Sequence, residues 1–205
     1  MFTGLVATTA PVVSYHDGEL CLRTDIPLRH GDSLAVDGCC LTVSECCGNG
    51  VALFQVSAET LARTHFINLQ SGQVLNLERP MSLQDRLHGH FVTGHIDATA
   101  RVTAITDDAQ AGMRLRVSLP RQYRHLVWEK GYCTLQGVSL TINSVAQTDE
   151  LALEFFLIPT TLQKTNLRAL QPECLINVEY DMHAKYLHNL YQNRAHDNDR
   201  LGADL

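Results

Sequence analysis

The sequence has few of the features that identify nucleic-acid-binding, membrane or secreted proteins. Its 16 Lys and Arg residues are outnumbered by 22 Asp and Glu residues, and the resulting net charge of −6 excludes a basic nucleic-acid footprint. No apolar run approaches the roughly 18 residues of a membrane-spanning helix, and the first residues lack the basic and apolar segments of a signal peptide. We therefore expect a cytoplasmic globular protein.

The cysteines do not indicate a disulfide framework. Their count, seven, is odd, and the adjacent pairs Cys39-Cys40 and Cys46-Cys47 have poor geometry for ordinary disulfides. Reduced thiols are the expectation for a cytosolic chain.

One motif occurs twice in the chain. Residues 38–43 read Gly-Cys-Cys-Leu-Thr-Val, and residues 137–142, 99 positions later, read Gly-Val-Ser-Leu-Thr-Ile. Further segments repeat in the same order at intervals of 90 or 101 residues: Thr3-Gly4 with Thr93-Gly94, Thr60-Leu61 with Thr161-Leu162, and Asn76 with Asn177. Two copies of about 90 residues predict two similar domains, each with its own core.

Each copy contains short segments rich in β-branched residues and separated by turn-forming pairs. In the first copy we predict strands over residues 3–13, 20–26, 33–36, 40–46, 51–56 and 73–77. Ser57 is the predicted N-cap of a one-turn helix, with Thr60 at the third helical position. Short strands at such intervals predict a small barrel or sandwich.

Two further helices are predicted. Residues 120–128 have no counterpart in the first copy, and Pro120 suits the first helical position. After Asp181, apolar residues recur every three or four positions from Ala184 to Ala195. This last helix lies outside both repeats, so its apolar stripe must pack on a domain or on another subunit.

Two related pockets could hold two copies of one ligand. Proximity alone could then lower the barrier to a reaction between identical molecules by several kcal/mol. The alternative is that the duplication simply builds a larger fold. Cys40 and Ser139 occupy equivalent positions, so the pockets would be similar but not equivalent. The alternative for Cys40 is a small buried hydrophobe. Thr42 and Thr141 recur as well and suit either ligand contacts or strand formation.

Three histidines, His88, His90 and His95, lie close together in sequence. No nearby cysteine or carboxylate completes a recognisable zinc spacing, so we predict no metal site. His95 corresponds to Leu5 in the first copy, and a polar group in only one pocket suits an acid, base or anchoring role. The alternative is a solvated turn histidine.

Two charged residues are further candidates. Lys130 could anchor an anionic or polyol group, or be an ordinary exposed lysine. Asp181 could orient a proton or cap the final helix.

Several motifs together resemble the riboflavin synthase family, alpha-chain type. They are Met1-Phe2-Thr3-Gly4, residues 38–43, Glu59-Thr60-Leu61, Asn76-Leu77-Glu78-Arg79, residues 89–95, Lys130-Gly131 and residues 137–141. The resemblance extends from residue 1 to about residue 187. It implies a mainly β fold of two tandem six-stranded Greek-key barrels, residues 1–90 and 91–187, and a C-terminal trimerisation helix and tail, residues 188–205. It also implies a homotrimer with active sites between subunits.

The implied enzyme is a transferase that catalyses the last step of riboflavin biosynthesis. Two molecules of 6,7-dimethyl-8-ribityllumazine, both bound in one site, exchange a four-carbon unit and give riboflavin and 5-amino-6-ribitylaminouracil. No metal or redox cofactor is implied. The alternatives are a non-catalytic lumazine- or flavin-binding protein of the same superfamily and a purely structural barrel protein.

The resemblance also implies site residues. The polar groups implied in catalysis are Ser33, Cys40, His95, Ser139 and Asp181. The first pocket would use Gly4, Leu5, Val6, Cys40, Leu41, Thr42, Gln55, Val56, Ser57, Ala58, Glu59 and Thr60. The second would use Gly94, His95, Ile96, Lys130, Ser139, Leu140, Thr141, Ile158, Pro159, Thr160, Thr161, Leu162 and Gln163.

The implied chemistry leaves the reacting groups open. Cys40, Ser33 or an activated water would add to C7 of one lumazine, while His95 or a hydroxyl removes a proton from the C7 methyl of the other. Gln136 and Thr160 depart from the family pattern, and we expect Gln136 to change a polyol contact in the second pocket. His65 reads as tolerated variation.

Overall fold

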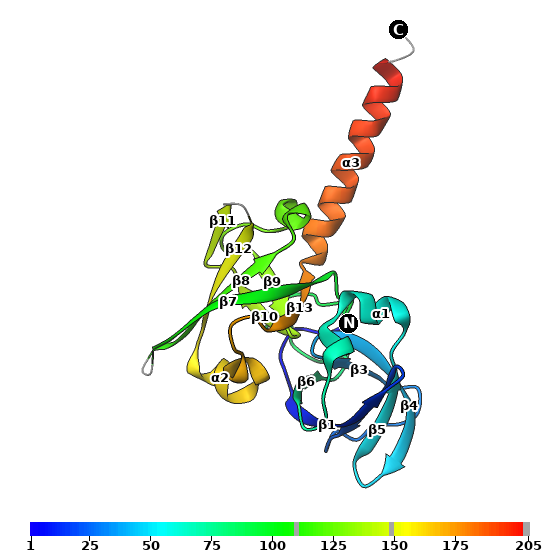
Figure 1. Ribbon diagram of the computed structural model, residues 1–205. Coiled ribbons are helices and arrows are strands. Elements are labelled where there is room, and N and C mark those ends of the chain that lie inside the picture. The colour runs from blue at the N-terminus through cyan, green and yellow to red at the C-terminus, as the bar shows by residue number, and fades with distance from the viewer. Residues whose placement is uncertain (109–110, 148–149, 203–205) are drawn as a thin grey trace.

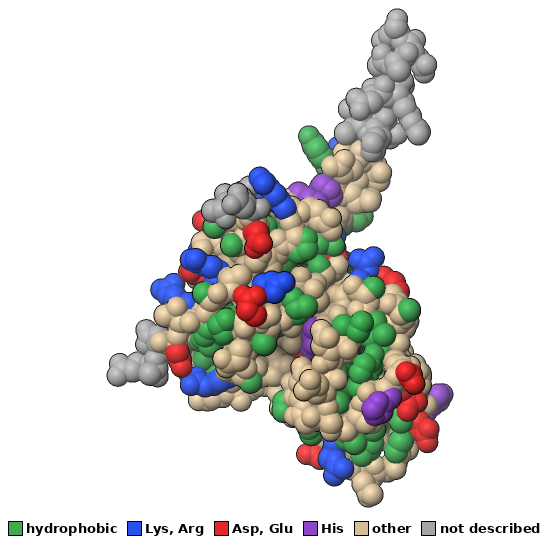
Figure 2. Space-filling view, viewed as in Figure 1, with side chains coloured by type: hydrophobic (Ala, Val, Ile, Leu, Met, Phe, Trp, Pro, Cys, Tyr) green, Lys and Arg blue, Asp and Glu red, His purple; other side chains and the backbone are tan. Residues whose placement is uncertain are grey.

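The computed structural model describes residues 1–108, 111–147 and 150–202. Two β-barrels lie beside each other, and one long helix projects away from both of them (Figure 1). In the space-filling view the barrels form two lobes, and the helix stands clear of them (Figure 2). The mainly β, two-barrel architecture expected from the repeats is confirmed.

The first barrel is closed, with the strand order β1-β2-β5-β4-β3-β6. Its strands are β1 (Thr8–His16), β2 (Glu19–Arg23), β3 (Ser33–Val36), β4 (Cys39–Gly48), β5 (Val51–Gln55) and β6 (Val74–Glu78). Helix α1 (Ala58–Arg63) and the 3-10 helix η1 (His65–Asn68) connect β5 to β6. The six predicted strands are present, and the Ser57 hydroxyl accepts a hydrogen bond from Thr60 N–H, as predicted. Only β1 differs markedly, because it begins at Thr8 and not at Thr3.

The second barrel repeats this plan with one strand divided. Its strands are β7 (Ala98–Asp108), β8 (Gly112–Leu119), β9 (Tyr132–Leu135), β10 (Val138–Thr141), β11 (Ser144–Gln147), β12 (Leu151–Leu157) and β13 (Leu175–Tyr180). Strands β10 and β11 form the two ends of the sheet and take the place of β4. Only Ile142 and Asn143 separate them, so the sheet curls back on itself at this point. The Asn143 side chain accepts a hydrogen bond from Phe156 N–H and bridges the break.

Three helical segments accompany the second barrel: η2 (Arg121–Leu126), α2 (Pro159–Lys164) and η3 (Asn166–Ala169). The extra helix predicted over residues 120–128 is therefore present, although it is a 3-10 helix. The final helix, α3 (Met182–Gly202), begins directly after Asp181, before the expected boundary at residue 188. Among the described residues, no helix is long and apolar enough to cross a membrane.

The two barrels meet around a pseudo-twofold axis. Phe2 and Val92, which are equivalent in the repeat, form an antiparallel bridge through two hydrogen bonds of 2.8 and 3.1 Å. Gly38 and Gly137 also face each other, since a Cβ added to either would lie within 2.8 Å of the other's backbone. Both have positive φ, so this contact requires glycine twice over. The repeated motif thus joins the barrels at its first residue.

A buried polar cluster reinforces this interface. The Asp37 carboxylate accepts hydrogen bonds from Asn76 N–H (2.7 Å), Asn166 Nδ2 (2.9 Å) and Gln136 Nε2 (2.9 Å), and His65 Nε2 lies 3.0 Å away.

One expectation fails at this cluster. Gln136 does not contact a ligand pocket, because it is only 3% exposed and also accepts a hydrogen bond from Asn177 N–H. His65, which the sequence gave as tolerated variation, is buried here beside Asp37.

Candidate active site

Each barrel anchors its own leading Thr-Gly segment with a glutamate from its last strand. Glu78 accepts hydrogen bonds from Thr3 N–H, Thr3 Oγ1 and Gly4 N–H. Glu179 accepts the equivalent three from Thr93 and Gly94. Burial raises the pKa of both carboxyl groups, and the same hydrogen bonds oppose this shift.

From these anchors the two segments cross to the opposite barrel. The Gly4 carbonyl accepts a 2.8 Å hydrogen bond from Ser139 N–H, and the Gly94 carbonyl accepts one of 2.8 Å from Cys40 N–H. Val6 packs against the second core and Ile96 belongs to the first. Gly4 and Val6 contact the second barrel in this way, and regular strand pairing in the first barrel begins only at Thr8.

The predicted grouping of the pocket residues is therefore wrong. The sequence placed residues 4–6 with Cys40 and residues 94–96 with Ser139, whereas the structure exchanges the two segments. His95 lies in the pocket of Cys40, and the exposed Leu5 follows the Gly4 contact with Ser139. The repeat shows which segments are equivalent but not which barrel each one touches.

A cavity of about 370 Å³ lies where the second segment meets the first barrel. Its walls come from the start of β4, from α1 and from the segment before β7. The lining residues are Cys39, Cys40, Glu59, Thr60, Arg63, Thr64, Gly94, His95, Ile96 and Asp97. Small-molecule pockets commonly measure about 300–1,000 Å³, so this cavity, the first pocket, can enclose a heterocycle.

Cys40 is held in this pocket as a neutral thiol. Burial raises the thiol's pKa, while a hydrogen bond with the Ser33 side chain opposes the increase. A cysteine becomes a strong nucleophile as the thiolate, which this environment disfavours. The sequence analysis gave Ser33 and Cys40 as alternative nucleophiles, and the structure places their side chains together.

Ser139, the counterpart of Cys40, has a different polar neighbour. His90 Nδ1 lies 2.7 Å from Ser139 Oγ, and the His90 ring stacks on Tyr132 with 5.2 Å between centroids. Burial lowers the pKa of His90, with a smaller opposing effect from Asp181 and a further decrease from His183. The serine is thus paired with an imidazole that favours its neutral form. Sequence reasoning considered His90 only as a metal ligand and missed this contact.

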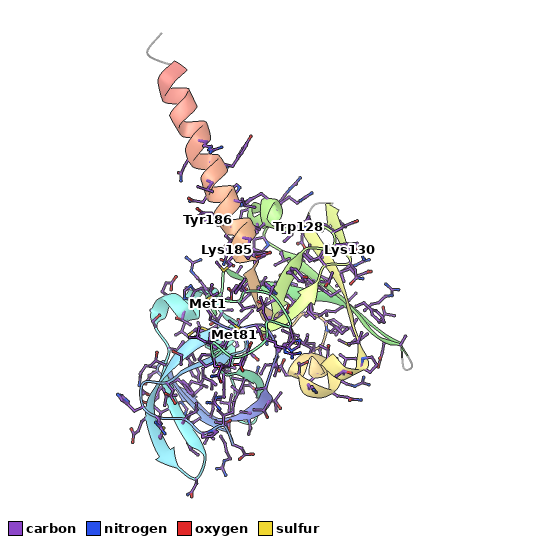
Figure 3. All side chains as sticks on the ribbon, turned by 180° about the vertical axis from the view of Figure 1, so that it is seen from behind. Met1, Met81, Trp128, Lys130, Lys185 and Tyr186 are labelled. Carbon is purple, nitrogen blue, oxygen red and sulfur yellow. The ribbon has the colours of Figure 1, made fainter. Side chains whose placement is uncertain are left out.

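Asp181 and Lys130 occupy simpler positions. The Asp181 carboxylate accepts a 2.9 Å hydrogen bond from His183 N–H, and it caps α3 in the way the sequence offered as one alternative. Lys130 is exposed, has a positive φ of 65° and donates its backbone N–H to Ile142 (Figure 3). The structure shows no contact between its side chain and Ser139.

The remaining predicted pocket residues divide between core and surface. Those buried in the barrel cores are Leu41, Val56, Leu140 and Leu162. Those exposed at the barrel ends are Thr42, Gln55, Ser57, Ala58, Thr141, Ile158, Pro159, Thr160 and Gln163, while Thr161 is half-buried. The leucines therefore position the neighbouring polar residues and do not themselves line the first pocket.

Sequence reasoning also missed Arg63, Thr64 and Asp97 in the first pocket. Arg63 follows Glu59 by four residues, which is the spacing of a helical ion pair, but nothing in the sequence indicates that Asp97 would face them. No group of three or more His, Cys, Asp or Glu side chains in the described part of the chain is arranged to hold a metal ion.

These features define a tandem-barrel protein in which each barrel mouth, the end that carries Cys40 or Ser139, contacts the leading segment of the other barrel. The first mouth holds a small-molecule pocket. The chain belongs to the lumazine-binding domain family, whose model, described as "Lumazine binding domain", matches residues 3–80 and 93–181. The two matched ranges correspond to the two repeats of the sequence.

Relatives with nearly full coverage are riboflavin synthases. The protein from Mycobacterium bovis is 38% identical over 197 residues, which cover 93% of this chain and 98% of the relative. The protein from Photobacterium leiognathi is 36% identical, with 93% and 88% covered, and that from Actinobacillus pleuropneumoniae is 33% identical, with 100% and 96% covered.

Solved structures support the same fold. The chain is similar to LumP complexed with riboflavin, with a TM-score of 0.75, 25% identity, and coverage of 88% of this chain and 99% of that one. LumP complexed with 6,7-dimethyl-8-(1'-D-ribityl) lumazine gives a TM-score of 0.73 at 23% identity, with the same coverage.

Proposed function

We propose that this chain is a riboflavin synthase. It catalyses the dismutation of two 6,7-dimethyl-8-ribityllumazine molecules into riboflavin and 5-amino-6-ribitylaminouracil by transfer of a four-carbon unit. Three riboflavin synthases match this chain at 33–38% identity over 88–98% of their length. The structural observation that carries the proposal is the pair of related but chemically different barrel mouths in one chain.

The difference between the mouths suits a reaction in which identical molecules take different roles. Cys40 presents a neutral thiol beside Ser33 and His95, whereas Ser139 is hydrogen-bonded to His90. A dismutation needs one molecule to give up carbon atoms and the other to receive them, so two identical pockets would serve it less well. Positioning of the two molecules supplies much of the rate acceleration.

The environment of Cys40 bears on the group that adds to C7 of the donor lumazine. Burial raises the pKa of the Cys40 thiol, while the hydrogen bond with Ser33 opposes this shift. We therefore propose Cys40, the Ser33 hydroxyl and an activated water molecule as the alternatives for this group. His90 and Ser139 are suited to accept a proton in the other mouth, because the imidazole favours its neutral form.

We also propose that the protein is a homotrimer with active sites between subunits. Tyr186, Leu187, Leu190 and Tyr191 on α3 are all exposed, and Figure 3 shows Tyr186 on α3 with Trp128 near the base of that helix. An apolar helix face without a partner in its own chain is suited to packing against other subunits. The trimer would bring the first mouth of one subunit to the second mouth of its neighbour.

The enzyme is proposed to act in the cytoplasm. All seven cysteines are free thiols in the structure, which fits a reducing compartment.

A single assay tests the catalytic proposal. The purified protein is mixed with 6,7-dimethyl-8-ribityllumazine and EDTA, and riboflavin absorbance is followed against a blank without protein. Multiple turnovers are expected. Ligand binding without riboflavin formation would instead identify a non-catalytic lumazine-binding protein, the alternative favoured by the structural similarity to LumP.

A further inference from the structure

The first pocket adjoins a second hollow, and the two share one wall. The second hollow has a volume of about 380 Å³ and lies between α1, the start of β7 and η2. Glu59, Arg63 and Asp97 line both spaces. Cys40 and His95 are found only on the first side, and Gln122 and Tyr123 only on the second. The shared side chains therefore separate the first pocket, which can hold a heterocycle, from the second hollow, which leads away from it.

Arg63 is held between the two barrels. Its Nε donates a 2.6 Å hydrogen bond to Glu59 Oε1 on the same helix, and its Nη1 donates a 3.4 Å hydrogen bond to the Asp97 carbonyl from the other barrel. The Asp97 carbonyl also accepts a 3.1 Å bond from the Tyr123 hydroxyl, and the Asp97 carboxylate pairs with Lys185 at 2.9 Å. The acceptor of the Arg63 bond is thus itself fixed in place.

This arrangement leaves donors and acceptors free at the shared wall. Arg63 Nη2 and Glu59 Oε2 have no hydrogen-bond partner among the described residues. Their neighbouring atoms are already engaged, and the Arg63 and Glu59 side chains are 51% and 73% exposed, so the free groups are accessible to a ligand. A vicinal diol offers one donor and one acceptor at each hydroxyl, which matches a guanidinium N–H beside a carboxylate oxygen.

An ordinary surface ion pair would not combine these features. An exposed pair four residues apart on a helix needs no contact with a second domain and contributes little to stability. Arg168, which pairs with Asp107 of β7 at 3.5 Å, belongs to an exposed ion pair within the second barrel and lines neither of the two spaces.

We propose that Arg63, together with Glu59, holds the polyol chain of the ligand in the first pocket, with the heterocycle on the Cys40 side and the chain directed past Arg63 into the second hollow. The inference rests on the proposed function, because it takes a ribityl-substituted heterocycle as the ligand. Arg63 is thus a specificity residue that distinguishes ligands with a ribityl chain from those without one.

The experiment measures occupancy of the first pocket alone. Cys40 is alkylated with N-ethylmaleimide and quantified by mass spectrometry, with the exposed Cys46 as the internal reference. The ligands are riboflavin and lumiflavin, which has the same ring system without the polyol. Wild-type protein is compared with Arg63→Ala and with the matched control Arg168→Ala, and riboflavin formation from the lumazine is measured in parallel.

In Arg63→Ala, the riboflavin concentration that half-protects Cys40 is expected to rise about tenfold, the effect of losing one hydrogen bond to a charged group, while the value for lumiflavin stays the same. Arg168→Ala should change neither value. Equal losses for both ligands, or no loss, would overturn the assignment of Arg63.

The same experiment distinguishes failure of the proposed enzyme function from failure of the inference about Arg63. If wild-type protein forms no riboflavin although riboflavin protects Cys40, the catalytic function is wrong, and the ratio between the two ligands still decides the role of Arg63. If riboflavin does not protect Cys40 in the wild-type protein, the inference is wrong whatever the assay of turnover gives.

Discussion

Asp37 accepts a 2.9 Å hydrogen bond from Gln136, the residue that occupies the same position in the other repeat. Each precedes the glycine at which the barrels touch, so the bond lies beside the pseudo-twofold axis. An identical pair of aspartates here would place two carboxylates together in a buried site. The substitution of an amide for one of them makes the two halves complementary.

Removal of the Asp37 carboxylate should strongly destabilise the protein. Asp37→Ala leaves Asn76 N–H and the side chains of Asn166 and Gln136 without their buried acceptor. We expect the free energy of unfolding to fall by about 3–5 kcal/mol. Urea denaturation measures it, with the exposed Asp25→Ala as a control that should stay within about 0.5 kcal/mol of wild type. A loss below about 1 kcal/mol would show that the cluster does not hold the barrels together.

Position 94 requires glycine, because the segment before β7 packs closely against Cys40 of the first barrel there. A Cβ there would lie 2.6 Å from the Cys40 Cβ, at a φ of +82°. Gly31 has a nearly identical φ of +85° but nothing within 4 Å of an added Cβ, so Gly31→Ala measures the conformational cost alone, about 1–2 kcal/mol.

We expect Gly94→Ala to cost clearly more than Gly31→Ala in denaturation experiments. It should also weaken lumazine binding at the first pocket by at least about tenfold, whereas Gly31→Ala should bind normally. Equal effects of the two substitutions on both measurements would contradict the described contact of Gly94 with Cys40.

The buried carboxyl of Glu78 predicts a dependence of stability on pH. Burial raises its pKa, so the folded protein binds this proton more tightly than the unfolded chain. The resulting stabilisation is fully present below the ordinary glutamate pKa, about 4.3, and is lost as the pH rises through the raised value. Denaturation midpoints of wild type and Glu78→Gln should therefore converge or cross as the pH is raised. A wild-type advantage that grows with pH would mean that the hydrogen bonds from Thr3 and Gly4 outweigh burial.

Charged substitutions on the exposed apolar face of α3 should separate the subunits. Leu187 and Leu190 are 64% and 42% exposed in the single chain. The double substitution Leu187→Asp and Leu190→Asp should convert the proposed trimer into monomers in sedimentation velocity experiments, because buried unpaired carboxylates are costly. Gln192→Glu, on an exposed position of the same helix, should leave the mass unchanged. An unaltered mass in the double variant would exclude this face as the subunit interface.

Local sequence signals predicted the elements well. Ser57 caps α1, and Gly38 and Gly137 open the two copies of the repeated motif, because capping and positive φ depend on residues within a few positions. The division of β10 from β11 was not predicted, since the same alternation continues through Ile142 in the sequence.

The candidate site was harder to predict, because its contacts are made between repeats. The sequence marked Cys40, Ser139 and His95 as chemically interesting, but the partners of each are set by the crossing of residues 3–7 and 93–97. In the sequence Arg63 is an ordinary helical arginine, and only the structure shows its hydrogen bond to Asp97 from the other barrel. Likewise, the sequence does not indicate that Gln136 forms a hydrogen bond with Asp37.

The exchange of leading segments also shows what a single chain gains over a symmetric dimer. Two separate copies of one such barrel, each lending its first residues to the other, would satisfy the same contacts, as the bridge between Phe2 and Val92 illustrates. In that dimer every change in one mouth would appear in the other. Covalent fusion removes this restriction, so one mouth can carry a cysteine at position 40 while the other carries a serine at position 139.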